Sequence, residues 1–269
     1  MDLLRRELAP IVSEAWKEID RQAKRVLTLN LAGRKLVDLD GPHGWQYAAL
    51  NLGRLEELEG APAPGVRASL RAAQPLVELR APFGVSLAEL DNVARGATDV
   101  ELNAVIEAAE RIAAAEDHAI FNGFGDAAIT GIIEASPHGA VRMPASAVEY
   151  PQAILQALEV FREAGVNGPY ALALGSDSFK ELSLATDNGY PVRKRIEQQI
   201  LDGPVLWAPA VPGAVVLSVR GGDFVLTLGQ DLSIGYAGHD RENVDLYLVE
   251  SLAFRVLEGS AAVHVRPST

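Results

Sequence analysis

The chain has 269 residues, 48% of them hydrophobic, and a formal net charge of -12 at neutral pH. A surface this negative repels nucleic acid and anionic lipid, so we expect neither as a partner. The absence of cysteine excludes disulfides, thiolate catalysis and thiolate metal sites. The N-terminus lacks a signal-peptide pattern, and no apolar run approaches the ~20 residues of a membrane span, so we expect a cytoplasmic protein.

The first third of the sequence predicts a helix followed by a long hairpin. Apolar residues at three- and four-residue steps predict a helix that begins at Ser13 and ends near Gly33. Residues 52–78 predict two extended arms around a tip at 60–65. At ~3.3 Å per residue the arms would reach about 40 Å, whereas a compact chain of this length has a radius of gyration of about 18 Å. The hairpin therefore either projects toward a neighbouring subunit or folds back on its own core.

The rest of the chain mixes helices and strands without a repeating unit, which indicates an irregular α+β fold. Ser86 and Glu89 predict a capped short helix, and Asp99 is expected to cap a long helix that runs to about Phe121. The pair Gly221–Gly222 predicts a two-residue hairpin turn between two strands. Further helices are expected at 151–164, 176–185 and 192–202, and strands at 170–175, 205–209, 213–220, 224–230 and 243–257.

Motifs that would carry chemistry are weak in this sequence. Residues 123–128 match a G-x-G-x-x-A pattern but follow a helix rather than a strand, so they do not predict a nucleotide site. No two histidines lie within five residues, and Ser176 fits a helix N-cap better than a nucleophile. We therefore expect no catalytic residue, no metal and no cofactor, although a catalytic triad assembled from distant residues stays open.

Four separated motifs, in register along essentially the whole chain, resemble the encapsulin shell proteins, a family once grouped with linocin-type bacteriocins. The motifs are MDLLRRELAPIVSEAW at the N-terminus, GPHGWQYAAL at 41–50, PLVELRAPF at 75–83 and RGGDFVLTLGQDLSIGY at 220–236. The resemblance implies an α+β fold of the tailed-phage major capsid (Hong Kong 97-like) type, with a projecting hairpin that pairs with neighbouring subunits. It implies a peripheral domain at 1–51, 79–133 and 224–269, an extended loop at 52–78 and an axial domain at 134–223.

The resemblance also implies a function without catalysis. Subunits would assemble into an icosahedral nanocompartment, with sixty copies in the smallest class, that encloses a cargo enzyme such as a ferritin-like iron-storage protein or a dye-decolorising-type peroxidase. A short C-terminal peptide of the cargo would bind a hydrophobic groove on the inner wall. The matching groove positions are Val26, Leu27, Asn30, Leu31, Arg34, Asp38, Ile234 and Tyr236.

A fivefold pore is the second site that the resemblance implies. Five copies of one aspartate around a narrow opening would favour cations over anions. The matching residues are Thr186, Asp187, Asn188, Gly189 and Tyr190. Some members of the family bind flavin on a tryptophan, but Ala88 occupies that position here, so we do not expect flavin.

Two rival interpretations differ from the shell in class. A free-standing enzyme of the protease or bacteriocin type would need a catalytic cluster, which the sequence does not show. A prophage capsid protein would need to tolerate nucleic acid and usually carries a maturation segment, and the charge of -12 argues against it. Hollow particles of uniform size would favour the shell over the free-standing enzyme. The nucleic-acid content of purified particles would distinguish the shell from the prophage capsid protein.

Overall fold

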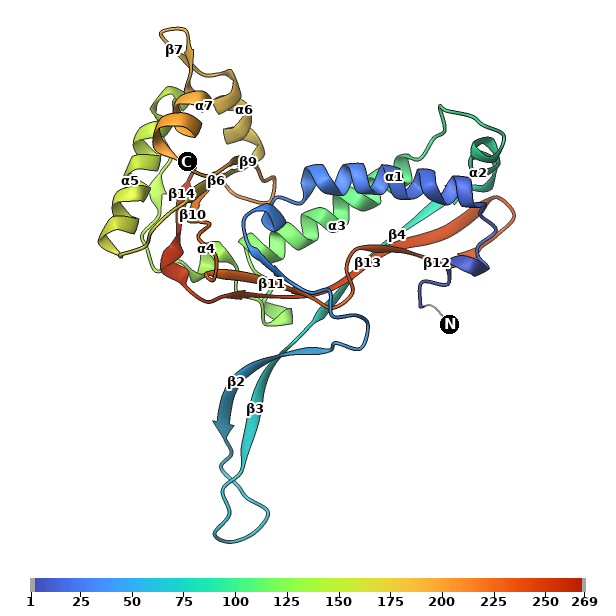
Figure 1. The fold of residues 1–269 in the computed structure, drawn as a ribbon, viewed down its shortest axis with the longest axis horizontal. Helices are drawn as coiled ribbons and strands as arrows, with labels where there is room; N and C mark the ends of the chain where they lie inside the picture. The colour runs from blue at the N-terminus through green and yellow to red at the C-terminus, as the bar shows by residue number, and fades with distance from the viewer. Residues whose placement is uncertain (1–2, 268–269) are drawn as a thin grey trace.

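The chain forms two lobes and one long hairpin in the computed structural model, which describes residues 3–267 (Figure 1). The peripheral lobe contains the helices α1 (Ser13–Asn30), α2 (Leu87–Ala94) and α3 (Asn103–Phe121) above a five-stranded sheet. The axial lobe contains the helices α5 (Tyr150–Glu163), α6 (Ser176–Leu184) and α7 (Val192–Arg195). A π-helical turn, Ile196–Ile200, continues α7, and the short helix α4 (Ile132–Ala135) connects the two lobes.

The peripheral sheet is organised around one long strand, β13 (Asn243–Val256). On one side β13 pairs antiparallel with β4 (Val77–Ser86), and on the other with β11 (Phe224–Leu228) and then β12 (Ser233–His239). The short strand β1 (Asp38–Asp40) adds in parallel to the outer edge of β11. β11 and β12 therefore follow one another along the same side of β13.

The helix layer is held together by small and branched apolar residues. Ala15, Ile19 and Ala23 recur every four residues along α1 and are almost completely buried. Val105 and Ala109 of α3 are equally buried and belong to the same apolar cluster. Small side chains at these positions let α1 approach α3 closely, so that α3 lies between α1 and the sheet (Figure 1).

The axial lobe contains a second five-stranded sheet, in which Leu172 and Leu217 pack with Phe161 of α5 in a fully buried core. The strands follow the order β5 (Val141–Arg142), β14 (Ala262–Arg266), β10 (Ala214–Ser218), β6 (Tyr170–Leu174) and β9 (Val205–Trp207). A two-stranded turn of β7 (Thr186–Asp187) and β8 (Tyr190–Pro191) stands at the far end of this lobe (Figure 1).

The predicted hairpin projects away from both lobes (Figure 1). Its arms are β2 (Ala49–Glu57) and β3 (Ser69–Pro75), which pair with each other and with no further strand of the described residues. Leu55 and Leu70 are 68% and 56% exposed, so these apolar side chains lack cover within one chain. The structure thus decides between the two alternatives in favour of projection.

Several predicted elements differ from the structure. The hairpin turn at Gly221–Gly222 is wrong, because β10 and β11 belong to different sheets. The two glycines, with φ of 85° and 84°, instead connect the axial lobe to the peripheral lobe, and the N–H of Gly222 donates to the carboxylate of Asp38. The long helix begins at Asn103 rather than at Asp99.

The expected domain boundaries need one correction, at the C-terminal end of the chain. Strand β14 pairs antiparallel with β10 and parallel with β5, so it belongs to the axial sheet rather than to the peripheral domain expected for 224–269. Its residues Ala262, Val263 and Val265 are buried in the axial core. None of the helices in the described residues is long and apolar enough to cross a membrane.

Candidate functional site

A groove of about 590 Å³ lies between α1 and the start of β12 in the peripheral lobe. Ala23 and Leu27 of α1, together with Leu31 at the C-cap of the helix, lie at four-residue steps and form the helical wall. Leu232 and Ile234 form the strand wall, and Leu248 of β13 lies beneath. The volume falls in the range of small-ligand and peptide sites, and the lining is mainly apolar.

One end of the groove is closed by an arginine held by three carboxylates. Arg34 donates from Nε and Nη2 to Glu116 at 2.6–2.9 Å, from Nη2 to Glu250 at 2.9 Å and from Nη1 to Asp231 at 2.7 Å. The side chains of Glu116 and Glu250 are completely buried, whereas that of Asp231 is 44% exposed at the groove edge. These bonds fix the guanidinium, so the groove ends in a rigid polar wall.

The charges in this cluster are strongly coupled. Burial alone would lower the pKa of Arg34, but the hydrogen bonds and charge of Glu116, Asp231 and Glu250 raise it above its usual value. Burial and the neighbouring charge of Glu116 raise the pKa of Glu250 well above its usual value, against the opposing effect of Arg34. Among the described residues, Oε1 of Glu250 has no hydrogen-bond partner. The carboxylates therefore favour the charged form of Arg34, while burial opposes the charged form of Glu250.

A second buried acid fixes the turn that follows α1. The carboxylate of Asp117 accepts from the backbone N–H of Ala32 at 3.0 Å and of Gly33 at 2.9 Å. Burial raises the pKa of Asp117 to about 7, although these two hydrogen bonds act in the opposite direction. A Cβ on Gly33 would lie 2.5 Å from Cδ1 of Ile120 and 3.1 Å from Oδ1 of Asp117, so a larger residue would require these side chains to shift. Asp117 thus positions the turn that carries Arg34.

The other end of the groove is formed by the N-terminal segment. Arg6 donates to Asp20 of α1 at 2.8 Å and stacks over the ring of Trp16 at 3.9 Å. The carbonyl of Leu4 accepts from the N–H of Tyr236 at 2.8 Å. Leu4 and Arg6 both line the groove, so the segment that precedes α1 is one of its walls.

Four of the eight expected groove residues line this hollow, namely Leu27, Leu31, Arg34 and Ile234. Val26 does not, because it lies one helical step from Leu27 and is buried against the core at 4% exposure. Asn30 lines a different hollow beside Trp207, and its side chain donates to the carbonyl of Val26. The remaining two are also placed elsewhere: Asp38 lies on β1 and bonds to Gly222, and Tyr236 lies further along β12.

The sequence analysis missed the N-terminal wall and the buried acids. Leu4 and Arg6 belong to a short irregular segment that shows no periodic pattern. Glu116 and Glu250 did leave a signal, because each interrupts an otherwise apolar helix face or strand, and buried charges require a partner. Only the structure identifies that shared partner as Arg34.

The expected pore residues form one tight turn at the far end of the axial lobe (Figure 1). Asn188 and Gly189, with φ of 48° and 81°, occupy its two central positions. The carboxylate of Asp187 accepts from the side chain of Asn188 at 3.0 Å and lies 3.5 Å from the guanidinium of Arg195. The negative charge expected at this tip is therefore partly compensated within the same chain.

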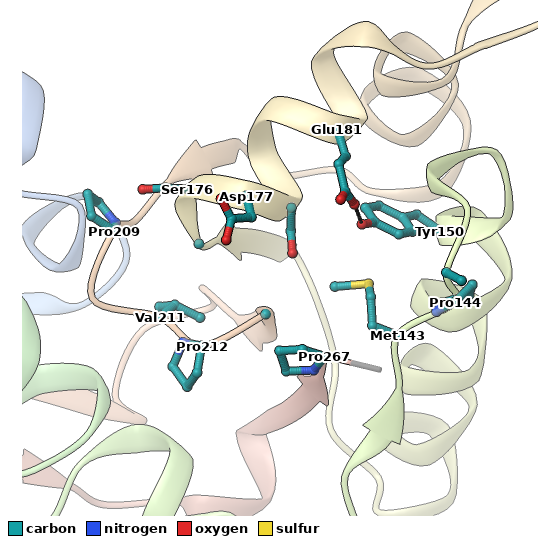
Figure 2. Close-up of a pocket in the computed structure, with 14 residues that line it drawn as sticks. Met143, Pro144, Tyr150, Ser176, Asp177, Glu181, Pro209, Val211, Pro212 and Pro267 are labelled. Atoms are coloured by element: carbon teal, nitrogen blue, oxygen red, sulfur yellow. Dashed lines mark hydrogen bonds between the residues drawn. The ribbon is translucent and has the colours of Figure 1, made fainter. Parts of the chain in front are cut away.

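A second hollow, of about 530 Å³, lies in the axial lobe (Figure 2). Tyr150 donates to Glu181 across it, and burial together with that carboxylate raises the pKa of the tyrosine. Ser176 accepts a hydrogen bond from Trp207, and no histidine is among the residues that line the hollow. The serine after β6 is therefore the first residue of α6, and no histidine lines the hollow beside it.

No group of three or more histidine and carboxylate side chains in the described part of the chain is positioned to hold a metal ion. Ala88, the position expected to lack a flavin-stacking ring, is exposed on α2.

Comparison with known proteins decides the family. A protein-family model described as an encapsulating protein for peroxidase matches residues 1–253. A type 1 encapsulin shell protein of Rhodospirillum rubrum is 48% identical over 99% of this chain and 97% of its own length. The chain belongs to the encapsulin shell proteins. A second encapsulin shell protein, from Rhodococcus erythropolis, is 46% identical over 98% of this chain and 99% of its own length. Members of this family with such names are shell proteins and not enzymes, and the same holds for this chain.

Solved structures confirm the expected capsid fold. A virus-like particle from Pyrococcus furiosus superposes with a TM-score of 0.63 over 93% of this chain and 98% of that chain, at 15% identity. The Gordonia phage Cozz structure superposes with a TM-score of 0.57 over 89% of this chain and 87% of that chain, at 13% identity. At such low identity the likeness shows the fold alone, and that fold is the encapsulin and tailed-phage capsid fold.

Proposed function

We propose that this chain assembles into a closed cytoplasmic compartment and holds a cargo enzyme on its inner wall by the enzyme's C-terminal peptide. The observation that carries the proposal is the apolar groove between Leu27, Leu31 and Ile234, which ends at the fixed Arg34. A preformed groove of this kind can bury a few apolar side chains of a peptide without rearrangement of the wall. Four residues of its lining, Leu27, Leu31, Arg34 and Ile234, are among the eight that the family resemblance suggests for a cargo site, which supports the proposal.

A peroxidase is the cargo that we favour, because the matching family is described by that role. A ferritin-like iron-storage protein is the second cargo that the resemblance implies. Mass spectrometry of proteins that co-purify with the particles identifies the cargo. We expect an enzyme with a short apolar C-terminal tail, and deletion of that tail should leave the particles empty. Loading that persists without the tail would contradict the role of the groove.

Assembly is supported by the projecting hairpin. Leu55 and Leu70 are largely exposed on arms that pair with each other, and the arm β3 contacts the rest of the chain at its base, where Gln74 donates to the carbonyls of Ala128 and Phe254. Burial against a neighbouring subunit would remove this apolar surface from water, which is favourable by about 25 cal/mol per Å². We expect negative-stain microscopy to show hollow particles of uniform size, consistent with sixty subunits and free of nucleic acid. Monomers, or particles filled with nucleic acid, would favour the enzyme or prophage interpretations.

The turn of β7 and β8 is proposed to surround the fivefold opening. Its exposed residues Thr186, Asn188, Gly189 and Tyr190 have no packing role in the axial core. Five copies of Asp187 would attract cations, but Arg195 lies 3.5 Å from each carboxylate and reduces that field. We therefore propose a pore with weak preference for cations, which also admits neutral substrates such as peroxide.

A further inference from the structure

The outer edge of the β11–β12 line is covered at both ends and open between them. β1 pairs with residues 225–227 of β11 at one end. At the other end the carbonyl of Leu4 accepts from the N–H of Tyr236. The stretch from Asp231 to Ile234 lies between these two covered parts and lines the groove. The groove is thus a section of the sheet edge that no other strand of the described residues covers.

The register with β13 shows which backbone groups face this edge. In an antiparallel pair, residues alternate between those that bond to the partner strand and those whose N–H and C=O point away from it. The backbone N–H and C=O of Tyr236 point away from β13, because the N–H donates to the carbonyl of Leu4. The register with β13 runs without a shift from Ser233 to Tyr236. The backbone N–H and C=O of Ile234 therefore also point away from β13, whereas those of Gly235 bond to it. Among the described residues, the N–H and C=O of Ile234 then have no strand partner on the groove side.

We propose that the bound peptide adds to β12 as an extra strand, with its backbone hydrogen-bonded to Ile234. This inference rests on the proposed function and specifies how the same groove recognises its peptide. Ile234 is only 4% exposed, so its N–H and C=O are poorly hydrated and gain from a partner. Strand addition supplies affinity through backbone bonds, and alternate side chains supply specificity.

The geometry sets the pattern that the peptide must have. Every second side chain would point toward the wall of Leu27 and Leu31, and the side chains between them would point away. Four residues of extended chain span about 13 Å. The bound peptide is therefore a short extended tail with apolar residues at alternate positions.

A second copy of this chain is a poorer occupant than a tail from another protein. Within residues 3–267, the segment that already meets the β12 edge is the N-terminal segment, whose Leu4 bonds to Tyr236 of the same chain. Arg6 ties that segment to Asp20 and Trp16 in place. The N-terminal segment would have to break these contacts to bind in the groove of a neighbouring subunit. A free C-terminal tail of another protein makes no such contacts beforehand.

A proline scan tests the backbone pairing directly. The probe is a fluorescent protein with the C-terminal tail Gly-Ser-Leu-Ser-Leu-Ser-Leu-Ser-Gly-Ser, co-expressed with the shell protein, and the readout is fluorescence per shell. Proline removes one N–H, so at each position that bonds to Ile234 it should lower loading about tenfold. At the positions between, the loss should be less than about twofold. The matched control replaces each serine of the tail by alanine instead of proline. These alanine variants keep the N–H group and should change loading little.

Hydrogen exchange gives a second, independent measurement. The amide of Ile234 should exchange about tenfold more slowly in shells loaded with the probe than in empty shells, whereas Gly235 should already be slow in both. If the probe loads in a Leu27-dependent manner but proline acts equally at all positions, strand addition is wrong and the groove stands. If the probe fails to load at all, the strand inference is wrong; the proposed function then depends on the tail-deletion experiment. If an N-terminal peptide of this chain competes with the probe, the occupant is a second copy.

Discussion

The groove and the turn at the tip of the axial lobe are built in opposite ways. The groove takes its residues from the N-terminal segment, α1, the turn after it, β12 and β13, and a buried ion cluster stands behind it. The tip consists of five consecutive residues, 186–190, in one two-strand turn. The groove is rigid and apolar because distant elements support it, whereas the tip is exposed and its charge depends on a single neighbour, Arg195. Changes behind the groove should therefore alter stability, and changes at the tip should alter only permeation.

Removal of Arg34 should have the largest effect on stability. Arg34→Ala leaves the buried carboxylates Glu116 and Glu250 without their cation. Breaking a buried pair from one side costs about 3–5 kcal/mol. We expect that loss in the free energy of unfolding, measured by denaturant titration. Arg21→Ala, which removes an exposed pair with Glu18, is the control and should cost less than about 1 kcal/mol. Equal losses for the two variants would contradict the role given to the cluster.

Asp117 should make stability depend on pH in a particular direction. Because burial raises its pKa from 3.8 to about 7, the folded chain binds more protons than the unfolded chain between these values. This contribution to stability is present at low pH and is lost as pH rises to about 7. It amounts to as much as about 1.4 kcal/mol per pH unit.

The matched variant Asp117→Asn isolates that slope. Asparagine cannot titrate, so the stability advantage of the unaltered protein over the variant should grow as pH falls from 7 to 4. The neighbours Glu116 and Lys35 remain in both proteins, as does Glu250, and their contributions cancel in the difference. Thermal unfolding of intact shells at pH 4, 5, 6 and 7 provides the measurement. A difference that is constant with pH would show that Asp117 does not carry the proton.

The tip of the axial lobe should give the smallest effects. Asp187→Asn removes the negative partner of the pair, and Arg195→Gln removes the positive one. We expect the first to slow and the second to speed passage of ferrous iron at low salt, each about two- to threefold. Salt near 0.15 M should reduce both effects, because screening acts within about 8 Å. If both variants changed the rate of iron passage in the same direction, the proposed role of the Asp187–Arg195 pair would be contradicted.

What the sequence predicted well was local. The helix at 13–30 and the strand at 243–256 follow from short-range patterns, and they appear in the structure close to the expected bounds. The turn at Gly221–Gly222 was misread because a glycine pair between strands also suits a connection between two sheets. Nothing local distinguishes the two cases, since strand partners are chosen by tertiary packing.

The groove was predicted only in part, for a related reason. Helical spacing indicates that Leu27 and Leu31 share a face, but it does not decide whether Val26, one step away, faces the core or the groove. Val26 is buried in the core because α3 packs against the side of α1 that carries it. Arg34 was expected from the family resemblance, whereas its partners Glu116 and Glu250 lie 82 and 216 residues away in sequence and could not be paired from spacing.

The central claim is that the groove beside Leu27 holds the cargo. The decisive measurement is the cargo-to-shell mass ratio of purified particles that carry Leu27→Asp, compared with particles that carry Leu29→Asp. Leu27 lines the groove, whereas Leu29 lies on the same helix and is 59% exposed outside it. We predict that both variants form shells, that the Leu27 variant is empty, and that the Leu29 variant is loaded normally. Normal loading of the Leu27 variant would contradict the account.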